Sequence, residues 1–411
     1  MHKKIKTADL MVGMYLQELC GSWIEHPFWR SSFVISDPKQ IALIRTSKVQ
    51  EVWIDTAKGL DVAAEALQAP DAAALGEARA AYDVVAEPPP APAPVPITEE
   101  LARAAEICAR SREAVASMFR EARMGNSVDT VGVNQLVEEI SDSVARNASA
   151  LISLARLKTA DDYTYMHSVA VCAMMIALAR QLSMDDAKIR AAGVAGLLHD
   201  MGKALLPISV LNKPGKLTPA EFAIVRGHPE LGHRLLSKGG GADPMALDVC
   251  LHHHEKTDGS GYPEGLKAVD LSLYAKMGAV CDVYDAITSN RPYKTGWDPA
   301  ESMRMMAQWT NGHFDATVFQ AFAESIGIYP VGSLVRLTSG HIAVVVEQSA
   351  SAFTAPIVKV FFSTKSMARI TPELLDLSVP GSREKISTRE NPAKWNFQDL
   401  NTLWSGLPAA H

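Results

Sequence analysis

The chain has 411 residues, of which 47% are hydrophobic and 21% are charged, the balance of an ordinary globular protein. Because this length exceeds a typical single core, we expect two or three domains. A formal net charge of −6 argues against a general nucleic-acid coat, and still allows a local basic pocket for an anion.

Three features favour a cytoplasmic protein without a membrane span. The N-terminal MHKKIKTADLMVGM is basic but has no sustained apolar run, so no signal peptide is expected. The most apolar stretch, VAVCAMMIALA at 169–179, is too short to cross a bilayer core about 30 Å thick and predicts a buried helix. The five cysteines are an odd set without a CxxC pair, which indicates reduced thiols.

The first hundred residues predict a small domain and a linker. Residues 1–65 mix short strand-like segments with a helix that starts near Pro38, which predicts an α+β domain. Residues 66–98 become rich in Ala and Pro and end in EPPPAPAPVP. Such a segment forms a semi-rigid spacer and builds no core of its own.

Helices are predicted from there to about residue 330. Amphipathic spacing predicts a helical connector at 99–150 and a helical domain at 151–330. Two helix starts in this domain carry a capping residue, a proline and then a glutamate three positions after the cap, at Thr218 and Asp298.

The character of the sequence changes after Tyr329. The segments SLVRL, HIAVVVEQ and PIVKVFF within 331–380 predict a small antiparallel sheet or barrel. We expect a weakly structured tail at 381–411. The predicted fold class is therefore mainly α: an all-helical domain with a small α+β N-terminal domain and a short β-rich C-terminal appendage.

Most of the twelve histidines lie between His167 and His313, many of them in apolar helical stretches. A single histidine is more often a core or surface residue, and we interpret His233 and His313 in that way. The whole set is harder to explain so, because a buried imidazole or carboxylate is costly unless it is paired or coordinated. A metal centre would satisfy five imidazoles and two carboxylates together: His167, His199, Asp200, His228, His253, His254 and Asp282.

These seven side chains exceed the needs of one ion that keeps an open coordination position, so two ions are favoured. Asp200 is the natural bridge, since its neighbour His199 can hold one ion while the carboxylate reaches both. Imidazole and carboxylate suit divalent ions such as Mn, Fe, Co, Ni or Zn. Two ions about 3.5–4 Å apart lower the pKa of a bridging water and clamp a phosphoryl group for in-line displacement.

Three motifs make a family resemblance specific. The linear order His, then His-Asp, then a late Asp resembles the HD phosphohydrolase superfamily. HDMGK (199–203), HHEKTDGSGYP (253–263) and DVYDAITSNRPYK (282–294) together resemble the HD-GYP family, bacterial phosphodiesterases of cyclic diguanylate (cyclic di-GMP). The resemblance covers about 150–330. Residues 5–65 resemble an N-terminal domain of undefined function that often precedes it, and 331–378 an appendage of some members.

The resemblance implies roles for individual residues. The seven histidines and aspartates above would be the metal ligands, and Lys203, Arg291 and Lys294 would bind the substrate phosphates. Asp200 and Lys203 would be the catalytic pair. A departure at Tyr163, where members with a third metal have glutamate, favours a dinuclear centre.

Six residues around the motifs have open roles. Glu255 and Asp285 are interpreted as orienting or structural partners of the ligands. His252 has no family counterpart, and a supporting role and an ordinary helix position are equally favoured. The loop residues Gly261, Tyr262 and Pro263 would either shape the pocket rim or contact diguanylate cyclase (GGDEF) domains.

The expected function is a metal-dependent phosphodiesterase that hydrolyses cyclic di-GMP to linear pGpG, or on to GMP, through a metal-bridging hydroxide. The expected cofactors are two divalent transition-metal ions, with Fe or Mn favoured. Two alternatives stay open: a nucleotide-binding sensor with little hydrolysis, and an HD hydrolase of another nucleotide. The metal, the final product, the signal read by the N-terminal domain and the oligomeric state are not decided by the sequence.

Overall fold

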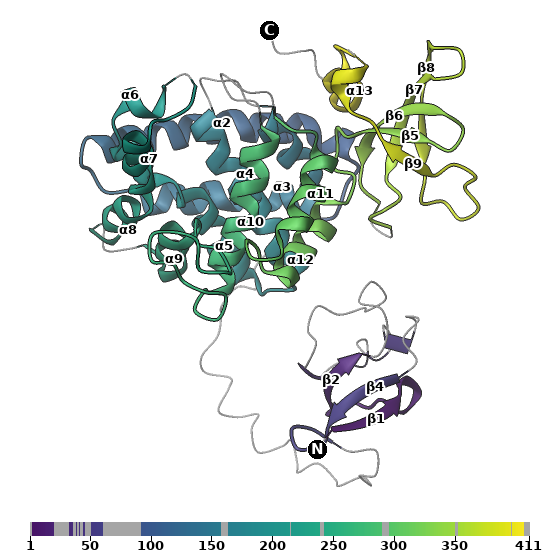
Figure 1. Ribbon diagram of the computed structural model, residues 1–411, viewed down its shortest axis with the longest axis horizontal. Helices are drawn as coiled ribbons and strands as arrows, with labels where there is room; N and C mark the ends of the chain where they lie inside the picture. Colours follow the sequence, from purple (N-terminus) through teal and green to yellow (C-terminus); the bar gives the residue numbers. More distant parts are fainter. Residues whose placement is uncertain are drawn as a thin grey trace, which may run out of the picture. The chain divides into compact units, whose positions relative to one another are not determined.

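The computed structural model of the chain divides into two units, Met1–Pro90 and Ala91–His411 (Figure 1). Each unit is described by itself. The residues that the structure describes are 2–19, 33–35, 38, 41, 44–45, 51–60, 92–157, 163–213, 215–238, 242–289, 296–349, 352–395 and 397–406.

The first unit contains a four-stranded antiparallel sheet in the order β1-β4-β2-β3. In β4, alternate residues Val52 and Ile54 point into the core while Glu51 is exposed, as a half-buried strand requires. Of the helix expected after Pro38, the structure describes only isolated positions, which are helical. The strands are β1 His2–Lys6, β2 Tyr15–Leu19, β3 Phe33–Val34 and β4 Glu51–Asp55.

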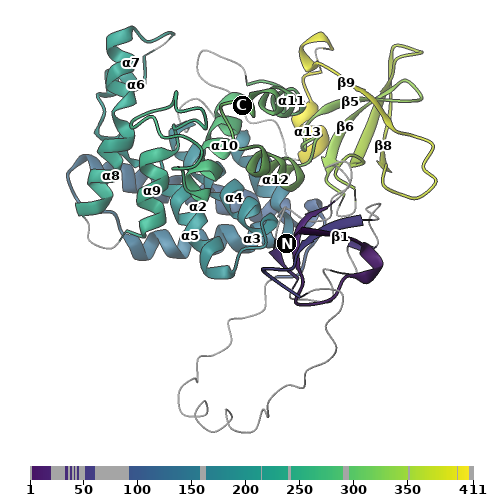
Figure 2. The ribbon, with the colours of Figure 1, turned by 60° about the horizontal axis from the view of Figure 1, so that its bottom comes forward.

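The second unit is mostly helical, and Figure 2 shows its helices from a second side. The predicted class, mainly α with an antiparallel sheet at each end of the chain, is confirmed. The helices are α2 Ile97–Arg123, α3 Thr130–Arg156, α4 Tyr163–Gln181, α5 Asp186–Leu198, η3 Met201–Leu205, α6 Ile208–Leu211, α7 Pro219–Arg226, α8 His228–Lys238, α9 Pro244–His252, α10 Leu273–Thr288, α11 Pro299–Trp309 and α12 Ala316–Ile326.

Helix α4 is the centre of this unit. Every residue from Met166 to Ala179 is buried, and the helix packs against α2, α3, α5, α10 and α12. A helix that is apolar on all sides needs such complete cover. The predicted buried helix at 169–179 is thereby confirmed. Among the residues that the structure describes, no helix is long and apolar enough to cross a membrane.

The predicted helix starts are also confirmed. The Thr218 hydroxyl accepts the N–H of Glu221, and the Glu221 carboxylate accepts the N–H of Thr218, so a capping box starts α7. The Asp298 carboxylate accepts the N–H of Glu301 at the start of α11.

The C-terminal sheet has five antiparallel strands in the order β8-β7-β6-β5-β9. Its last strand falls within the segment for which a weakly structured tail was expected. This strand, ISTR at Ile386–Arg389, has no fully buried residue. Its sequence therefore lacks the apolar alternation from which a strand is predicted. The elements are β5 Leu334–Leu337, β6 His341–Glu347, β7 Ile357–Ser363, β8 Ala368–Asp376, β9 Ile386–Arg389, η4 Pro392–Lys394 and α13 Leu400–Ser405.

One carboxylate ties this sheet to the helices. Glu347, the last residue of β6, accepts the N–H of Ile97 at 2.8 Å and the side-chain amide of Asn147 at 3.0 Å. The same amide donates to the carbonyl of Val95 at 3.0 Å. Asn147 has an extended backbone that interrupts α3, so Glu347 holds together the linker, the break in α3 and the start of α2.

A second buried carboxylate joins α2 to α3. Glu100 is fully buried and accepts two hydrogen bonds from the Arg146 guanidinium, at 2.7 and 2.9 Å, and one from the Ser143 hydroxyl at 2.8 Å. Burial would raise the pKa of Glu100, but these hydrogen bonds outweigh it and lower the pKa below its ordinary value.

We expect Glu100→Ala to lower the free energy of unfolding by about 3 kcal/mol, because it leaves the Arg146 guanidinium unpaired. Glu139→Ala is the matched control: it removes an exposed pair with Arg110, whose loss changes the stability little because water and salt screen such a pair. Urea unfolding measures both. Since the pKa of Glu100 is depressed in the folded state, its contribution is present above about pH 4.3 and is lost on acidification. Equal losses for the two variants would contradict this.

Candidate metal centre

The seven predicted ligands come from five separate places in the helical unit and meet in one buried cluster. Histidines and aspartates that lie up to 115 positions apart in sequence thus share one site, because the helices that carry them all pack around α4 and α5. They are His167 in α4, His199 and Asp200 at the end of α5, His228 at the start of α8, His253 and His254 directly after α9, and Asp282 in α10.

A glycine brings two of these places together. A Cβ at Gly202 would lie 1.9 Å from the carbonyl oxygen of His228 and 2.5 Å from the amide nitrogen of Gly232. Only a residue without a side chain allows η3 to approach α8 this closely. The glycine of HDMGK therefore sets the distance between Asp200 and His228.

Four of the five imidazoles are oriented through their Nδ1 atoms. The Nδ1 of His167 lies 2.6 Å from Oδ2 of Asp285. The others face backbone carbonyl oxygens: His199 that of Gly196 at 2.7 Å, His228 that of Val225 at 2.7 Å, and His253 that of Val249 at 3.0 Å. Because carbonyl and carboxylate oxygens accept, each Nδ1 carries a proton, and the Nε2 lone pair of an otherwise unprotonated ring is left to bind a metal ion.

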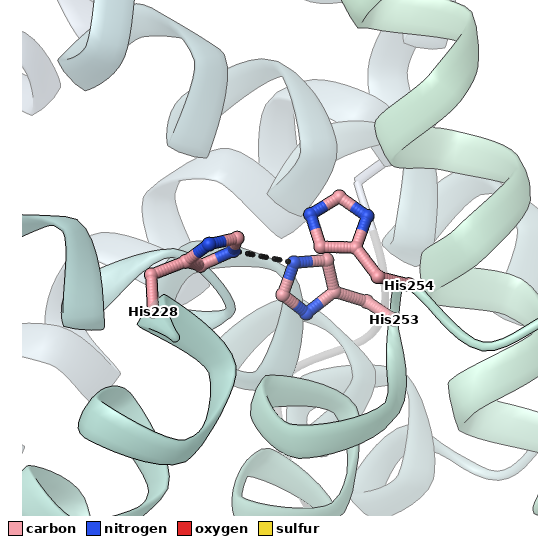
Figure 3. A group of neighbouring side chains, drawn as sticks. All are labelled: His228, His253 and His254. Atoms are coloured by element: carbon pink, nitrogen blue, oxygen red, sulfur yellow. Dashed lines mark hydrogen bonds between the residues drawn. The ribbon is translucent and has the colours of Figure 1, made fainter. Parts of the chain in front are cut away.

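These lone pairs face one another. The Nε2 atoms of His167 and His199 are 3.3 Å apart, and those of His228 and His253 are 3.2 Å apart. Figure 3 shows the second pair, with His254 beside His253. Two lone pairs at this distance repel, whereas cations between the rings and the nearby carboxylates would stabilise the arrangement. The donor set therefore fits metal ions.

The carboxylate of Asp200 lies between the two imidazole pairs. Its Oδ2 is 3.4 Å from Nε2 of both His167 and His199. Its Oδ1 is 3.2 Å from Nε2 of His228 and 3.8 Å from that of His253. This Oδ1 atom is buried and makes no hydrogen bond to any residue that the structure describes. One oxygen for each pair is the geometry of a bridging ligand.

Asp282 and His254 complete the two groups. Oδ1 of Asp282 lies 3.0 Å from Nε2 of His167, and its Oδ2 lies 3.7 Å from Nδ1 of His254. His228, His253 and His254 form one set of ligand atoms close enough to hold an ion, and His167, His199 and Asp282 form another. The structure thus contains buried His/Asp clusters suited to more than one metal ion.

The charges of the cluster favour a bound cation. Burial opposes a proton on His167, but three carboxylate neighbours outweigh burial and raise the pKa of this imidazole to about 10. Burial would also raise the pKa values of Asp200 and Asp282, yet Lys203 and two imidazoles hold that of Asp200, and three imidazoles that of Asp282, well below the usual range. Burial and the neighbouring rings lower the pKa of His253. The carboxylates that favour a proton on His167 would equally favour a metal ion in its place, and the His253 ring, whose pKa is lowered, is a neutral ligand.

Lys203 lies at the edge of this cluster. Its Nζ is 2.5 Å from Oδ2 of Asp200, and its side chain is 21% exposed. The ammonium group can therefore reach both the carboxylate and a molecule that approaches from solvent. The other two predicted phosphate-binding residues, Arg291 and Lys294, lie outside the residues that the structure describes.

The partners of Asp285 and Glu255 differ from one another. Asp285 orients the imidazole of His167, which is the contact expected of a supporting carboxylate. Glu255 was expected to orient an imidazole in the same way, and this expectation is wrong. Its buried carboxylate instead accepts the backbone N–H groups of the following loop, from Glu264, Gly265 and Leu266 at 2.7, 2.9 and 3.1 Å.

His252 faces away from the cluster. Its Nδ1 lies 2.8 Å from Oδ1 of Asp248, and its Nε2 lies 3.5 Å from a carboxylate oxygen of Glu264. The burial of His252 disfavours its charged form, but these two acidic neighbours raise its pKa. His252, the first of the three consecutive histidines, therefore contacts Asp248 of α9 and Glu264 of the loop and is not part of the metal-binding group.

The GYP loop packs onto the chain that carries His254. A Cβ at Gly261 would lie 2.4 Å from the Cα of Glu255, so this close approach requires glycine. The N–H of Tyr262 donates to the carbonyl of His254 at 3.2 Å, and the two rings stack with centroids 4.7 Å apart. Pro263 follows in the segment that Glu255 holds. A second tyrosine, Tyr163, stacks on His167.

One further residue was missed by the sequence analysis. The guanidinium of Arg226, the last residue of α7, lies 4.6 Å from the centre of the Tyr262 ring. No motif contains this arginine, and its place two residues before His228 is the one signal that could have drawn attention to it.

The fold and the site define a helical protein with a buried His/Asp metal-binding centre. Residues 138–318 match the HD domain, and residues 2–133 match a domain of unknown function (DUF3391). The chain is 52% identical over 408 residues to the "Cyclic di-GMP phosphodiesterase PA4108" of Pseudomonas aeruginosa, which covers 99% of this chain and 96% of that protein. The chain therefore belongs to the HD-domain family, with the HD-GYP motifs and an N-terminal domain of undefined function, as expected.

Two other relatives match shorter parts of the chain. The "Cyclic di-GMP phosphodiesterase response regulator RpfG" of Xanthomonas campestris is 45% identical over 124 residues, which is 29% of this chain and 32% of that protein. The "3'3'-cGAMP-specific phosphodiesterase 3" of Vibrio cholerae is 32% identical over 168 residues, 41% of this chain and 36% of that protein.

We expect Gly202→Ala to abolish metal binding, because the new methyl group would force η3 away from the carbonyl of His228. Gly227→Ala is the control: its Cβ would meet only the carbonyl oxygen of Ile224, at 3.3 Å, although it adjoins the same histidine. Metal content after loading, with circular dichroism as a check of folding, measures the effect. Full metal content in folded Gly202→Ala protein would disprove the role of this glycine.

Proposed function

We propose that this chain is a metal-dependent phosphodiesterase that hydrolyses cyclic di-GMP, with linear pGpG as the first product. The observation that carries the proposal is the buried Asp200 carboxylate, which turns one oxygen to each of two imidazole pairs. The 52% identity to a protein named as a cyclic di-GMP phosphodiesterase, over nearly the whole of both chains, supports the substrate.

The proposed centre holds two ions. His167, His199 and Asp282 would hold one, His228, His253 and His254 the other, and Asp200 would bridge them. Divalent ions held there would supply a hydroxide nucleophile at neutral pH and neutralise charge on the phosphoryl oxygens. We favour Fe or Mn for this set of imidazole and carboxylate donors. An aromatic ring, Tyr163, stands where a glutamate would support a third ion, which favours a dinuclear centre.

The protein side chains then bind and orient the phosphodiester. Hydrolysis joins a water oxygen to phosphorus and breaks the bond from phosphorus to the 3′ oxygen. Negative charge grows on the non-bridging oxygens, and the Lys203 ammonium lies where it can stabilise that charge. Arg291 and Lys294 are proposed, from the family resemblance, to bind the phosphates as a bidentate fork and a point charge.

We also propose the GYP loop as a contact surface for a diguanylate cyclase (GGDEF) domain. Because the Tyr262 ring stacks on His254, a partner would meet the exposed residues of the loop: Asp258, Ser260 and Glu264. Glu255 holds the backbone of this loop, so the surface is formed before a partner arrives.

The test is hydrolysis by the purified full-length chain, loaded anaerobically with Fe(II) or with Mn(II), with metal counted in the same samples. We expect turnover of cyclic di-GMP with about two ions per chain. The same assay with 3′3′-cGAMP distinguishes the substrates. Binding of cyclic di-GMP without turnover at full metal occupancy would make the chain a nucleotide sensor, and faster hydrolysis of 3′3′-cGAMP would replace the proposed substrate.

Asp200→Asn is the matched variant in that assay. Removal of the bridging charge is expected to reduce turnover to background and to lower the metal content, because both imidazole pairs lose their shared carboxylate. Asp186→Asn, an exposed change in the helix that leads to the site, is the control and should behave as the wild type. Wild-type rates with metal retained in Asp200→Asn would refute a bridged pair of ions.

Lys203→Ala is expected to retain metal and to lower kcat by about 10²-fold, since it removes one donor to the developing charge. Lys188→Ala, which removes an exposed lysine paired with Asp185, controls for the loss of a positive charge. Steady-state kinetics separate the possibilities: a rise in KM with kcat unchanged would mean that Lys203 binds substrate and transition state equally well.

A further inference from the structure

The orientation of His254 is held differently from that of the other four imidazoles. Their Nδ1 atoms are fixed by hydrogen bonds, but no residue that the structure describes makes a hydrogen bond to the ring of His254. Its closest carboxylate contact, from Nδ1 to Oδ2 of Asp282, is 3.7 Å and too long for one. His254 is also the least buried of the five, with 23% of its side chain exposed. Some other contact has to hold this ring in place.

The rings of His228 and His253 lie on the cluster side of His254, with centroids 5.0 and 4.2 Å away, and the contact from outside the ligand set is the ring of Tyr262. The His254 and Tyr262 rings stack with an interplanar angle of 29° and centroids 4.7 Å apart. The backbone on both sides of Tyr262 is fixed, by the close approach of Gly261 to Glu255 and by the N–H groups that Glu255 accepts from Glu264 onward. The orientation of the tyrosine ring itself therefore depends on its side-chain neighbours.

Arg226 is the neighbour that lies over this ring. Helix α7, which ends at Arg226, has no buried residue, so the arginine is not part of a core. Among the residues that the structure describes, no carboxylate lies within ion-pair distance of its guanidinium, which instead lies 4.6 Å from the centre of the Tyr262 ring. A guanidinium over an aromatic face is attracted by the ring, and its planar shape suits stacking.

We propose that Arg226 is a positioning residue for the metal centre: it holds the Tyr262 ring, and through that ring it orients the imidazole of His254 toward the second ion. The expected effect on turnover rests on the proposed function. The expected effect on metal binding rests only on the two contacts of Tyr262, with Arg226 and with His254. Partners that orient metal-ligating histidines typically change metal affinity or activity about 10–100-fold when they are removed.

The experiment compares Arg226→Gln, Arg226→Lys and the wild type, each as the full chain, in titrations with Co(II) followed by visible absorption. We expect Arg226→Gln to lower the affinity for the second Co(II) ion about 10-fold and to change the absorption spectrum of bound Co(II). The reason is that the His254 ring is no longer held in its orientation. Arg226→Lys keeps a cation over the ring and should restore part of the affinity. Arg234→Gln, an exposed arginine on α8, is the matched control and should leave the titration unchanged.

A double-mutant cycle tests the route through the tyrosine. Tyr262→Phe keeps an aromatic face and should bind metal as the wild type does, whereas Tyr262→Leu should reproduce the loss seen in Arg226→Gln. The double variant Arg226→Gln/Tyr262→Leu should lose no more metal affinity than either single variant, because both changes remove the same contact. Losses that add would overturn the proposal.

Kinetics with cyclic di-GMP separate positioning from direct contact with substrate. Positioning predicts a lower kcat with little change in KM, together with the altered Co(II) spectrum. A higher KM with an unchanged spectrum would overturn the proposal and assign Arg226 to the substrate. If the wild type binds two ions but hydrolyses nothing, the proposed function fails, and the Co(II) titrations still decide the role of Arg226.

Discussion

A fully buried carboxylate with an imidazole pair on each of its oxygens is the constraint on which the catalytic unit depends. Burial of Asp200 is costly unless its charge is balanced, and the balance comes from the Lys203 ammonium and from imidazoles at α4, the end of α5, α8 and the segment after α9. These elements must therefore approach one point. The glycine of HDMGK and the wholly buried α4 are the means by which they do so.

Around that point the structure orients the imidazoles by three kinds of local contact. Three rings use backbone carbonyl groups one helical turn earlier, at Gly196, Val225 and Val249, so the helices themselves aim the Nε2 atoms. One uses the carboxylate of Asp285. The fifth depends on aromatic stacking with the GYP loop. Rigid elements thus position most of the centre, and one exposed loop positions the rest.

Sequence reasoning reached the cluster because histidines and aspartates in apolar helices have few inexpensive alternatives to a shared partner. It also found the helical class, the caps at Thr218 and Asp298, and the C-terminal sheet. It failed for side chains that bind backbone groups of a loop and for a strand without an apolar pattern. Glu255 binds three amide groups that no pattern reveals, and the strand at Ile386–Arg389 has no buried alternation.

The carboxylate of Glu347 has a consequence for synthesis of the chain. It accepts the N–H of Ile97, a residue 250 positions earlier, and so satisfies the start of α2. When the ribosome has made α2 and α3, this acceptor has not yet been translated, and the amide of Asn147 also lacks it. The helical unit can reach its final hydrogen-bonded state only after β6 has emerged from the ribosome, whereas the N-terminal unit is free to fold earlier.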